Sequence, residues 1–177
     1  MTTRRLYIAF VWAAAAWAAL IVLAPFLASR AHASTFGAAV TLAVYAIGSA
    51  VCHQLPARSF QLWTAQMPVC ARCTGIYFGA AVMALVTFRS PARLRAVGTT
   101  AGPPKLARVS RERGWKSLAL QQTAFVVALA VLPSAATLVF EWTSGQTPAN
   151  WIRLAAGVPI GVAVAWLVRA AAENQVN

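Results

Sequence analysis

The run LYIAFVWAAAAWAALIVLAPFLA, residues 6–28, contains no charged residue and is long enough to cross a lipid bilayer, which takes about 20 residues. Four further apolar runs follow it, at residues 36–51, 74–88, 117–140 and 154–168. Backbone groups in lipid must form their hydrogen bonds within the segment, so each run predicts a helix. The sequence therefore predicts an all-α polytopic membrane bundle, a single domain over residues 1–177 with about five transmembrane helices.

The overall composition agrees with a bilayer as the chain's main partner. Hydrophobic residues make up 60% of the 177 residues, charged residues only 10%, and there is no aspartate. Soluble domains carry roughly 25% charged residues. This balance excludes an ordinary water-surrounded domain.

The net charge of +12 is concentrated in one segment. Eight of the fifteen lysines and arginines lie in residues 89–116, a glycine- and proline-containing stretch between two apolar runs. Basic clusters beside membrane spans set orientation or contact anionic lipid headgroups. Because no nucleic-acid-binding motif accompanies them, we predict a flexible basic loop at the lipid surface and no nucleic-acid partner.

The start of the chain has features of a secretory signal. Arg4 and Arg5 precede the first apolar run, and Ala31-His32-Ala33 has the Ala-x-Ala pattern of a cleavage site. The run exceeds the usual length of about 7–15 residues. We therefore expect a retained helix, with cleavage within residues 1–33 as the alternative.

Cysteine and histidine gather in one polar loop between the second and third runs. All three cysteines and one of the two histidines fall within residues 52–73. Cys70 and Cys73 have the spacing of thiolate metal sites, and Cys52 and His53 would complete a tetrahedral set for zinc or another transition metal. The side chains of adjacent residues such as Cys52 and His53 do not easily turn toward the same ion. An alternative site therefore uses the three thiolates, with His53 outside the ligand set.

Two other interpretations of this loop remain open. Cys70 and Cys73 would serve as a thiol–disulfide or electron-transfer pair, with Cys52 as partner and Arg72 favouring the thiolate. Alternatively, the cysteines staple or pack the loop in a structural or assembly protein. No recognisable motif assigns an enzymatic reaction.

Five consecutive spans would place the Cys52–Cys73 loop and residues 141–153 on one face. The cysteines would then share that face with a supporting polar shell of Arg58, Arg72, Glu141, Asn150 and Arg153. In this arrangement the opposite face carries ten basic residues and the cysteine face five. The positive-inside rule then predicts an extracytoplasmic cysteine face and N-terminus, although Arg4 and Arg5 oppose that orientation.

Two blocks of sequence carry a family resemblance. CHQLPARSF, residues 52–60, is followed by PVCARCTGIYFG, residues 68–79, and a looser motif begins with NWIR at residues 150–153. Together they resemble an uncharacterised family of prokaryotic integral membrane proteins, a domain of unknown function. The resemblance covers about residues 45–168. It implies a helical fold in a prokaryotic plasma membrane and supplies no reaction.

Four glycines predict close helix contact. Gly75 and Gly79 in the third run, and Gly157 and Gly161 in the fifth, have the small-x3-small spacing. Such spacing lets helix backbones approach closely in membranes. We therefore expect the third and fifth helices to pack against each other.

Overall fold

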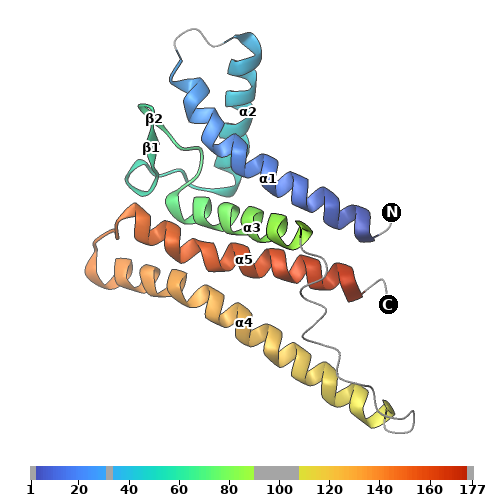
Figure 1. Ribbon diagram of the computed structural model, residues 1–177. Helices are drawn as coiled ribbons and strands as arrows, with labels where there is room; N and C mark the ends of the chain where they lie inside the picture. Colours follow the sequence, from blue (N-terminus) through green and yellow to red (C-terminus); the bar gives the residue numbers. More distant parts are fainter. Residues whose placement is uncertain (1–2, 31–33, 90–107, 175–177) are drawn as a thin grey trace.

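The computed structural model describes residues 3–30, 34–89 and 108–174, with side chains over 5–30, 34–89 and 121–173. In this part of the chain it contains five long helices, which confirms the all-α prediction (Figure 1). They are α1 (Thr3–Ala28), α2 (Thr35–Val51), α3 (Ala71–Arg89), α4 (Arg108–Ser144) and α5 (Asn150–Asn174). The connection from α2 to α3 holds a short 3-10 helix, η1 (Pro56–Arg58), and two strands, β1 (Gln61–Leu62) and β2 (Ala65–Gln66).

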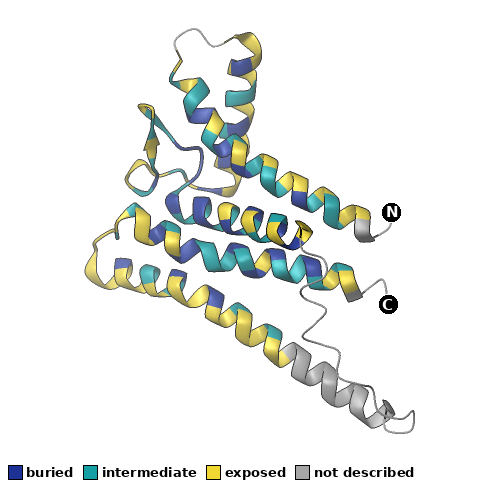
Figure 2. Ribbon diagram, in the orientation of Figure 1, coloured by how far each residue is buried: buried dark blue, intermediate teal, exposed yellow. Residues whose placement is uncertain are grey.

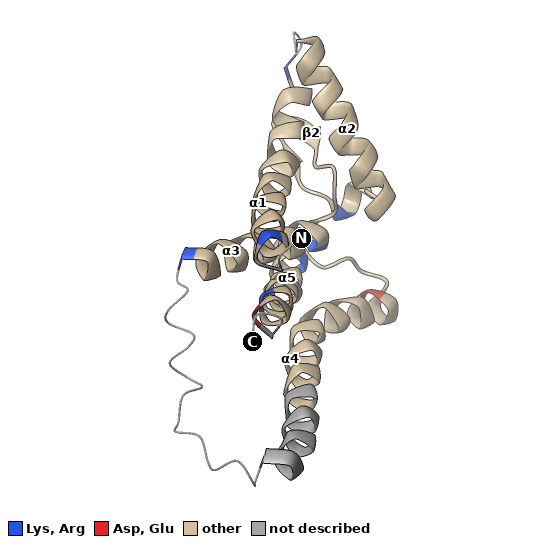
Figure 3. Ribbon diagram, turned by 90° about the vertical axis from the view of Figure 1, so that its right-hand side faces the viewer, with Lys and Arg blue, Asp and Glu red and all other residues tan. Residues whose placement is uncertain are grey.

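Four of the helices are long and apolar enough to cross a bilayer. The qualifying segments are Arg5–Ala28, Ala71–Arg89, Gln121–Ser144 and Asn150–Glu173. Exposed positions run along their outer sides (Figure 2), and large apolar side chains such as Trp12 and Phe125 are among them. Charged residues are sparse on these helices (Figure 3). An apolar exterior is what lipid requires, so the chain is an integral membrane protein.

The fourth helix differs from its expected bounds. It begins at Arg108, inside the stretch expected to be a loop, because arginine, glutamate and lysine are good helix formers that extend the helix beyond its apolar part. Residues 90–107 lie outside the described residues, as do the side chains of the basic segment beyond them. The expected contact with lipid headgroups therefore remains a prediction.

The contact between α3 and α5 is the centre of the bundle. A Cβ atom on Gly75 or Gly79 would overlap the backbone of α5, and one on Gly157 or Gly161 would overlap the backbone of α3. Gly75 faces Leu154, and Gly79, one turn later, faces Val158, so the two helices run in the same direction. The prediction of close packing between these helices is confirmed.

The first helix runs opposite to α3. The Tyr7 hydroxyl, near the start of α1, lies 2.7 Å from Thr87 Oγ1, near the end of α3. Ile21, near the end of α1, packs against Val69 just before α3 begins. The N-terminal end of α1 therefore lies at the face of the bundle where α3 ends, as Figure 1 also shows.

This direction differs from the five-span expectation, which placed the N-terminus at the cysteine face. With 17 residues, α2 is about 26 Å long, shorter than a hydrocarbon core of about 30 Å. It runs at a steep angle to the other helices, beside the last turns of α1 (Figure 1). Phe26, near the end of α1, stacks edge-on with Trp63 of the cysteine loop at 5.3 Å between ring centroids. The end of α1 is thus on the cysteine side.

Candidate functional site

The three cysteine sulfurs converge at one end of the bundle. Cys52 follows the last residue of α2 in an extended conformation, Cys70 precedes α3, and Cys73 lies in its first turn. Their Sγ atoms all lie within 4.8 Å of one another. The structure therefore brings together two segments that are separated by a loop in the sequence.

Hydrogen bonds of the connecting loop hold Cys52 beside α3. Gln54 donates to the carbonyls of Tyr45 at 3.0 Å and Pro68 at 2.6 Å, which ties the end of α2 to the chain that enters α3. Gly48 permits this approach, because a Cβ there would overlap the Pro68 carbonyl. Gln54 itself has a φ of 48°, a left-handed conformation that costs about 1–3 kcal/mol and persists only where surroundings enforce it.

Gln54 and Gly48 were not among the predicted site residues. Gln54 stands inside the block that carries the family resemblance, which was the available signal for it. A glutamine side chain does not by itself predict a role in positioning the cysteines. Gly48 has no feature in the sequence, apart from its small size, that would predict one. Both act on the site through the backbone rather than through the sulfurs.

An apolar shell surrounds the sulfurs. Cys52 is buried in a cluster with Ile21, Met67 and Val69, and the aromatic rings of Trp17 and Tyr77 pack against it. Val69 and Ile21 are fully buried. A shell of this kind limits water access and strengthens electrostatic interactions at the sulfurs.

Local hydrogen bonds favour a thiolate at Cys70. The backbone N–H of Cys70 donates to Cys52 Sγ at 3.2 Å. The pKa of the Cys70 thiol is lowered to about 5, chiefly because the Cys73 thiol hydrogen-bonds to its sulfur. The Cys73 and Arg72 N–H groups at the start of α3 also lower the Cys70 pKa, while burial acts in the opposite direction. Thiolates are the form that binds metals and attacks disulfides.

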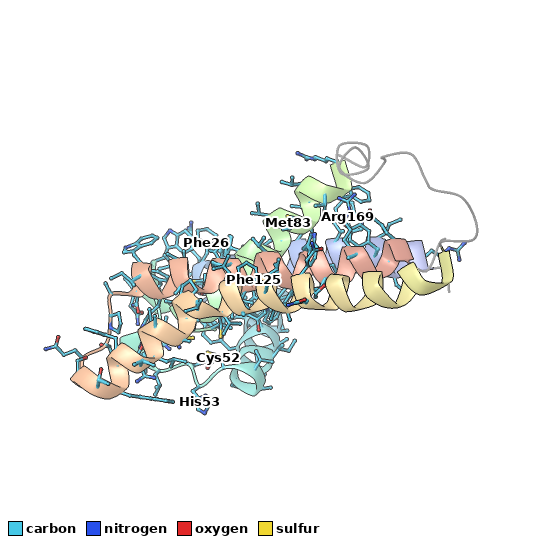
Figure 4. All side chains as sticks on the ribbon, turned by 90° about the horizontal axis from the view of Figure 1, so that it is seen from below. Phe26, Cys52, His53, Met83, Phe125 and Arg169 are labelled. Carbon is cyan, nitrogen blue, oxygen red and sulfur yellow. The ribbon has the colours of Figure 1, made fainter. Side chains whose placement is uncertain are left out.

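His53 does not join the sulfurs. It is exposed, and the ligand group of the described residues consists of the three cysteines alone. Figure 4 shows the His53 ring at the margin of the molecule, directed away from the helices. The adjacent residue Cys52 turns inward, so the extended backbone sends the two side chains in opposite directions.

The predicted polar shell forms a separate cluster around Glu141. Arg72 and Arg153 contact Oε1, the former at 3.3 Å, and Arg58 lies 3.4 Å from Oε2. The Glu141 side chain is 4% exposed and that of Arg153 is 2% exposed. Four distant segments, η1, α3, α4 and α5, therefore meet on one buried carboxylate.

Asn150 joins the loop to α5 rather than to that carboxylate. Its side-chain amide donates to the Ser59 carbonyl at 3.1 Å. Beside it, the rings of Phe60 and Trp151 lie 4.9 Å apart. These contacts fix the cysteine loop against the start of α5.

The fold and the site together define a class: a helical integral membrane protein with three converging thiols near one membrane face. A family described as "Predicted membrane protein (DUF2085)" matches residues 52–167, which is most of the chain, and the protein belongs to this family. The matched region begins at Cys52 and includes all three cysteines, Glu141 and Arg153. The first helix and all of α2 lie before it.

Two archaeal relatives are similar to parts of the chain. "Uncharacterized protein MJ1492" of Methanocaldococcus jannaschii is 45% identical over 62 residues, 35% of this chain and 40% of that protein. An "Uncharacterized protein" of Methanothermobacter thermautotrophicus is 26% identical over 119 residues, 67% of this chain and 85% of that protein. The chain thus spans less than half of the first relative. No solved structure matches.

Proposed function

We propose that this membrane protein binds a thiophilic transition-metal ion of the zinc type through the Sγ atoms of Cys52, Cys70 and Cys73. The observation that carries the proposal is their mutual separation of at most 4.8 Å. Thiolates bound to zinc at about 2.3 Å lie about 3.8 Å from one another. Only a small inward movement of the side chains is needed for all three to reach one ion.

The surroundings of the sulfurs support this assignment. The hydrogen bond from Cys70 N–H to Cys52 Sγ at 3.2 Å is of the kind that orients a thiolate ligand. Three protein ligands, with His53 directed elsewhere, leave a coordination position for an external ligand. Sites with such a position bind or activate another molecule, whereas purely structural zinc sites are filled by the protein.

Metal analysis of the full chain, purified in detergent without chelators, tests the proposal. We expect a single metal ion per chain in the wild type, loss of the ion in Cys52→Ser, Cys70→Ser and Cys73→Ser, and full retention in His53→Ala. His53→Ala is the matched control, because it removes an imidazole that is next to Cys52 in the sequence but lies outside the three-sulfur cluster. Protein that takes up no zinc although all three thiols are reduced would contradict the proposal.

A thiol–disulfide role is the second candidate, and the lowered pKa of Cys70 favours it. In that role a partner's disulfide would be reduced to two thiols. The Cys70 and Cys73 thiols would supply the two electrons and two protons and would themselves be oxidised to a disulfide. We rank metal binding above it because Cys52 completes a three-sulfur cluster, whereas exchange needs only two. Thiol labelling of membranes before and after reduction distinguishes them: three free thiols under both conditions exclude the exchange role.

We infer that the cysteine face is extracytoplasmic in a prokaryotic plasma membrane. Because α1 begins and α3 and α5 end at the opposite face, we assign to it Arg169 and, from their position in the sequence, Arg4, Arg5 and the eight basic residues of 89–116. Arg30, Arg58, Arg72 and Arg153 remain on the cysteine side. The excess of basic residues on the face opposite the cysteines is therefore larger than in the five-span arrangement. Arg4 and Arg5, which precede the first helix, now support the same orientation.

Reporter fusions test this orientation. Alkaline phosphatase is active outside the cytoplasm and green fluorescent protein inside it. We expect fluorescence and no phosphatase activity from fusions at both ends of the chain. Active phosphatase at either end contradicts the inferred orientation.

A further inference from the structure

The buried cluster around Glu141 is unbalanced in charge. Three guanidinium groups, of Arg58, Arg72 and Arg153, contact a single carboxylate, so three positive charges face one negative charge. Arg153 is almost completely buried, and a buried charge is costly unless it is paired and hydrogen-bonded. Two positive charges at this point are not neutralised by the acidic side chains of the described residues.

The cluster also has donors that the described residues do not use. The Nε atoms of Arg72 and Arg153 are both buried and have no hydrogen-bond partner within the described part of the chain. Arg72 directs its Nη2 to Thr137 Oγ1 at 2.8 Å and to Glu141. A guanidinium binds an oxyanion through its N–H donors, and each of these arginines keeps its Nε–H available for such a contact.

Two helix ends add to the positive potential. Arg72 lies in the first turn of α3 and Arg153 in the first turn of α5, where free N–H groups give a helix its partial positive charge. A cation at that end is unfavourable by itself. Access from the membrane face exists at Arg58, whose side chain is 40% exposed.

We propose that Arg58, Arg72 and Arg153 form a binding site for a phosphate group, either that of a lipid headgroup or that of a free phosphate. Phosphate supplies the negative charge that the cluster lacks and several oxygens in a geometry that guanidinium forks recognise. Glu141 holds the three arginines together and keeps them directed at one point. The site uses none of the three sulfurs as a ligand and does not depend on a bound metal, although Arg72 lies between Cys70 and Cys73 in the sequence.

Thermal unfolding of the full chain in a neutral detergent tests the site. The probes are inorganic phosphate, with chloride at matched ionic strength, and a short-chain phosphatidic acid, with a neutral phosphate-free lipid of the same chain length. We expect a rise in the unfolding midpoint with at least one phosphate probe and none with its control. The probe with the lower apparent Kd identifies the source.

Arginine variants make the test specific. Arg58→Gln removes the most exposed member of the cluster, so the variant should fold, and we expect its apparent Kd for the effective probe to rise about tenfold. Arg30→Gln is the matched control, because Arg30 is exposed and stacks on Phe26 outside the cluster. We expect it to bind as the wild type does. Absence of stabilisation by both phosphate probes, or equal weakening in the two variants, would overturn the proposal.

Discussion

Replacing Glu141 by glutamine removes the one negative charge that three arginines share. The change preserves size and leaves a carbonyl that accepts a hydrogen bond, so it isolates the charge. Its main effect falls on Arg153, whose side chain is 2% exposed and would remain charged and buried. Removing one partner of a buried ion pair costs about 3–5 kcal/mol.

The other two arginines contribute less to the expected loss, because Arg72 keeps its hydrogen bond to Thr137 and Arg58 is partly exposed. Arg58 is 40% exposed and water screens its pair with Glu141, which limits that contribution to about 1 kcal/mol or less. The glutamine carbonyl offsets part of the loss. We therefore expect Glu141→Gln to lower the free energy of unfolding by about 3 kcal/mol, a large part of a typical total of about 5–15 kcal/mol.

The assay is reversible unfolding in mixed detergent micelles, followed by helical circular dichroism. Glu173→Gln is the matched control, since Glu173 pairs with Arg169 at 2.9 Å but its side chain is 63% exposed. Its loss should cost about 0.5 kcal/mol or less. The double variant Glu141→Leu with Arg153→Met removes both buried charges and should recover most of the stability. A Glu141→Gln variant as stable as Glu173→Gln would refute this account of the cluster.

Three further predictions concern the sulfurs and the helix contact. In metal-free protein, alkylation of Cys70 should be nearly pH-independent above its pKa of about 5 and should slow as the pH falls below it, because the thiolate is then protonated; a rate still rising through neutral pH would show an ordinary thiol. Gly161→Ala places a methyl group against the Ile76 carbonyl and should lower the free energy of unfolding by about 1–3 kcal/mol in the same micelle assay. The control Gly145→Asn, in open space at a φ of 68°, should lower it by under about 0.5 kcal/mol. Equal losses in the two variants would argue against close α3–α5 packing. Gln54→Ala keeps all three sulfurs but frees the chain that positions them, so zinc affinity in a competition assay should fall by about 10–100-fold, and an unchanged affinity would remove Gln54 from the site.

The apolar runs located the helices well but not their ends. The apolar run at 154–168 lies within the longer helix Asn150–Asn174, because helices continue through polar residues such as Arg169 at the membrane surface. Hydropathy marks the part of a helix that lies in lipid, whereas helix ends depend on capping and on loops. The α4 terminus, for example, follows from Gly145 at φ 68°, whose N–H bonds the Glu141 carbonyl at 3.0 Å.

The direction of α1 and the exclusion of His53 could not be derived from the sequence. The alternation of faces assumes that each apolar run crosses the bilayer, and α2 is too short and too steeply placed to satisfy that assumption. The Cys70–Cys73 spacing correctly predicted two converging sulfurs. That Cys52 turns inward and His53 outward depends on the extended backbone after Val51, which residue types do not specify.

X-ray absorption at the metal edge of zinc-loaded protein tests the central claim most directly. We expect a shell of three sulfur atoms at about 2.3 Å from the ion, unchanged in His53→Ala and absent from each cysteine-to-serine variant, which no longer retains the ion. A shell made only of nitrogen and oxygen atoms would contradict it.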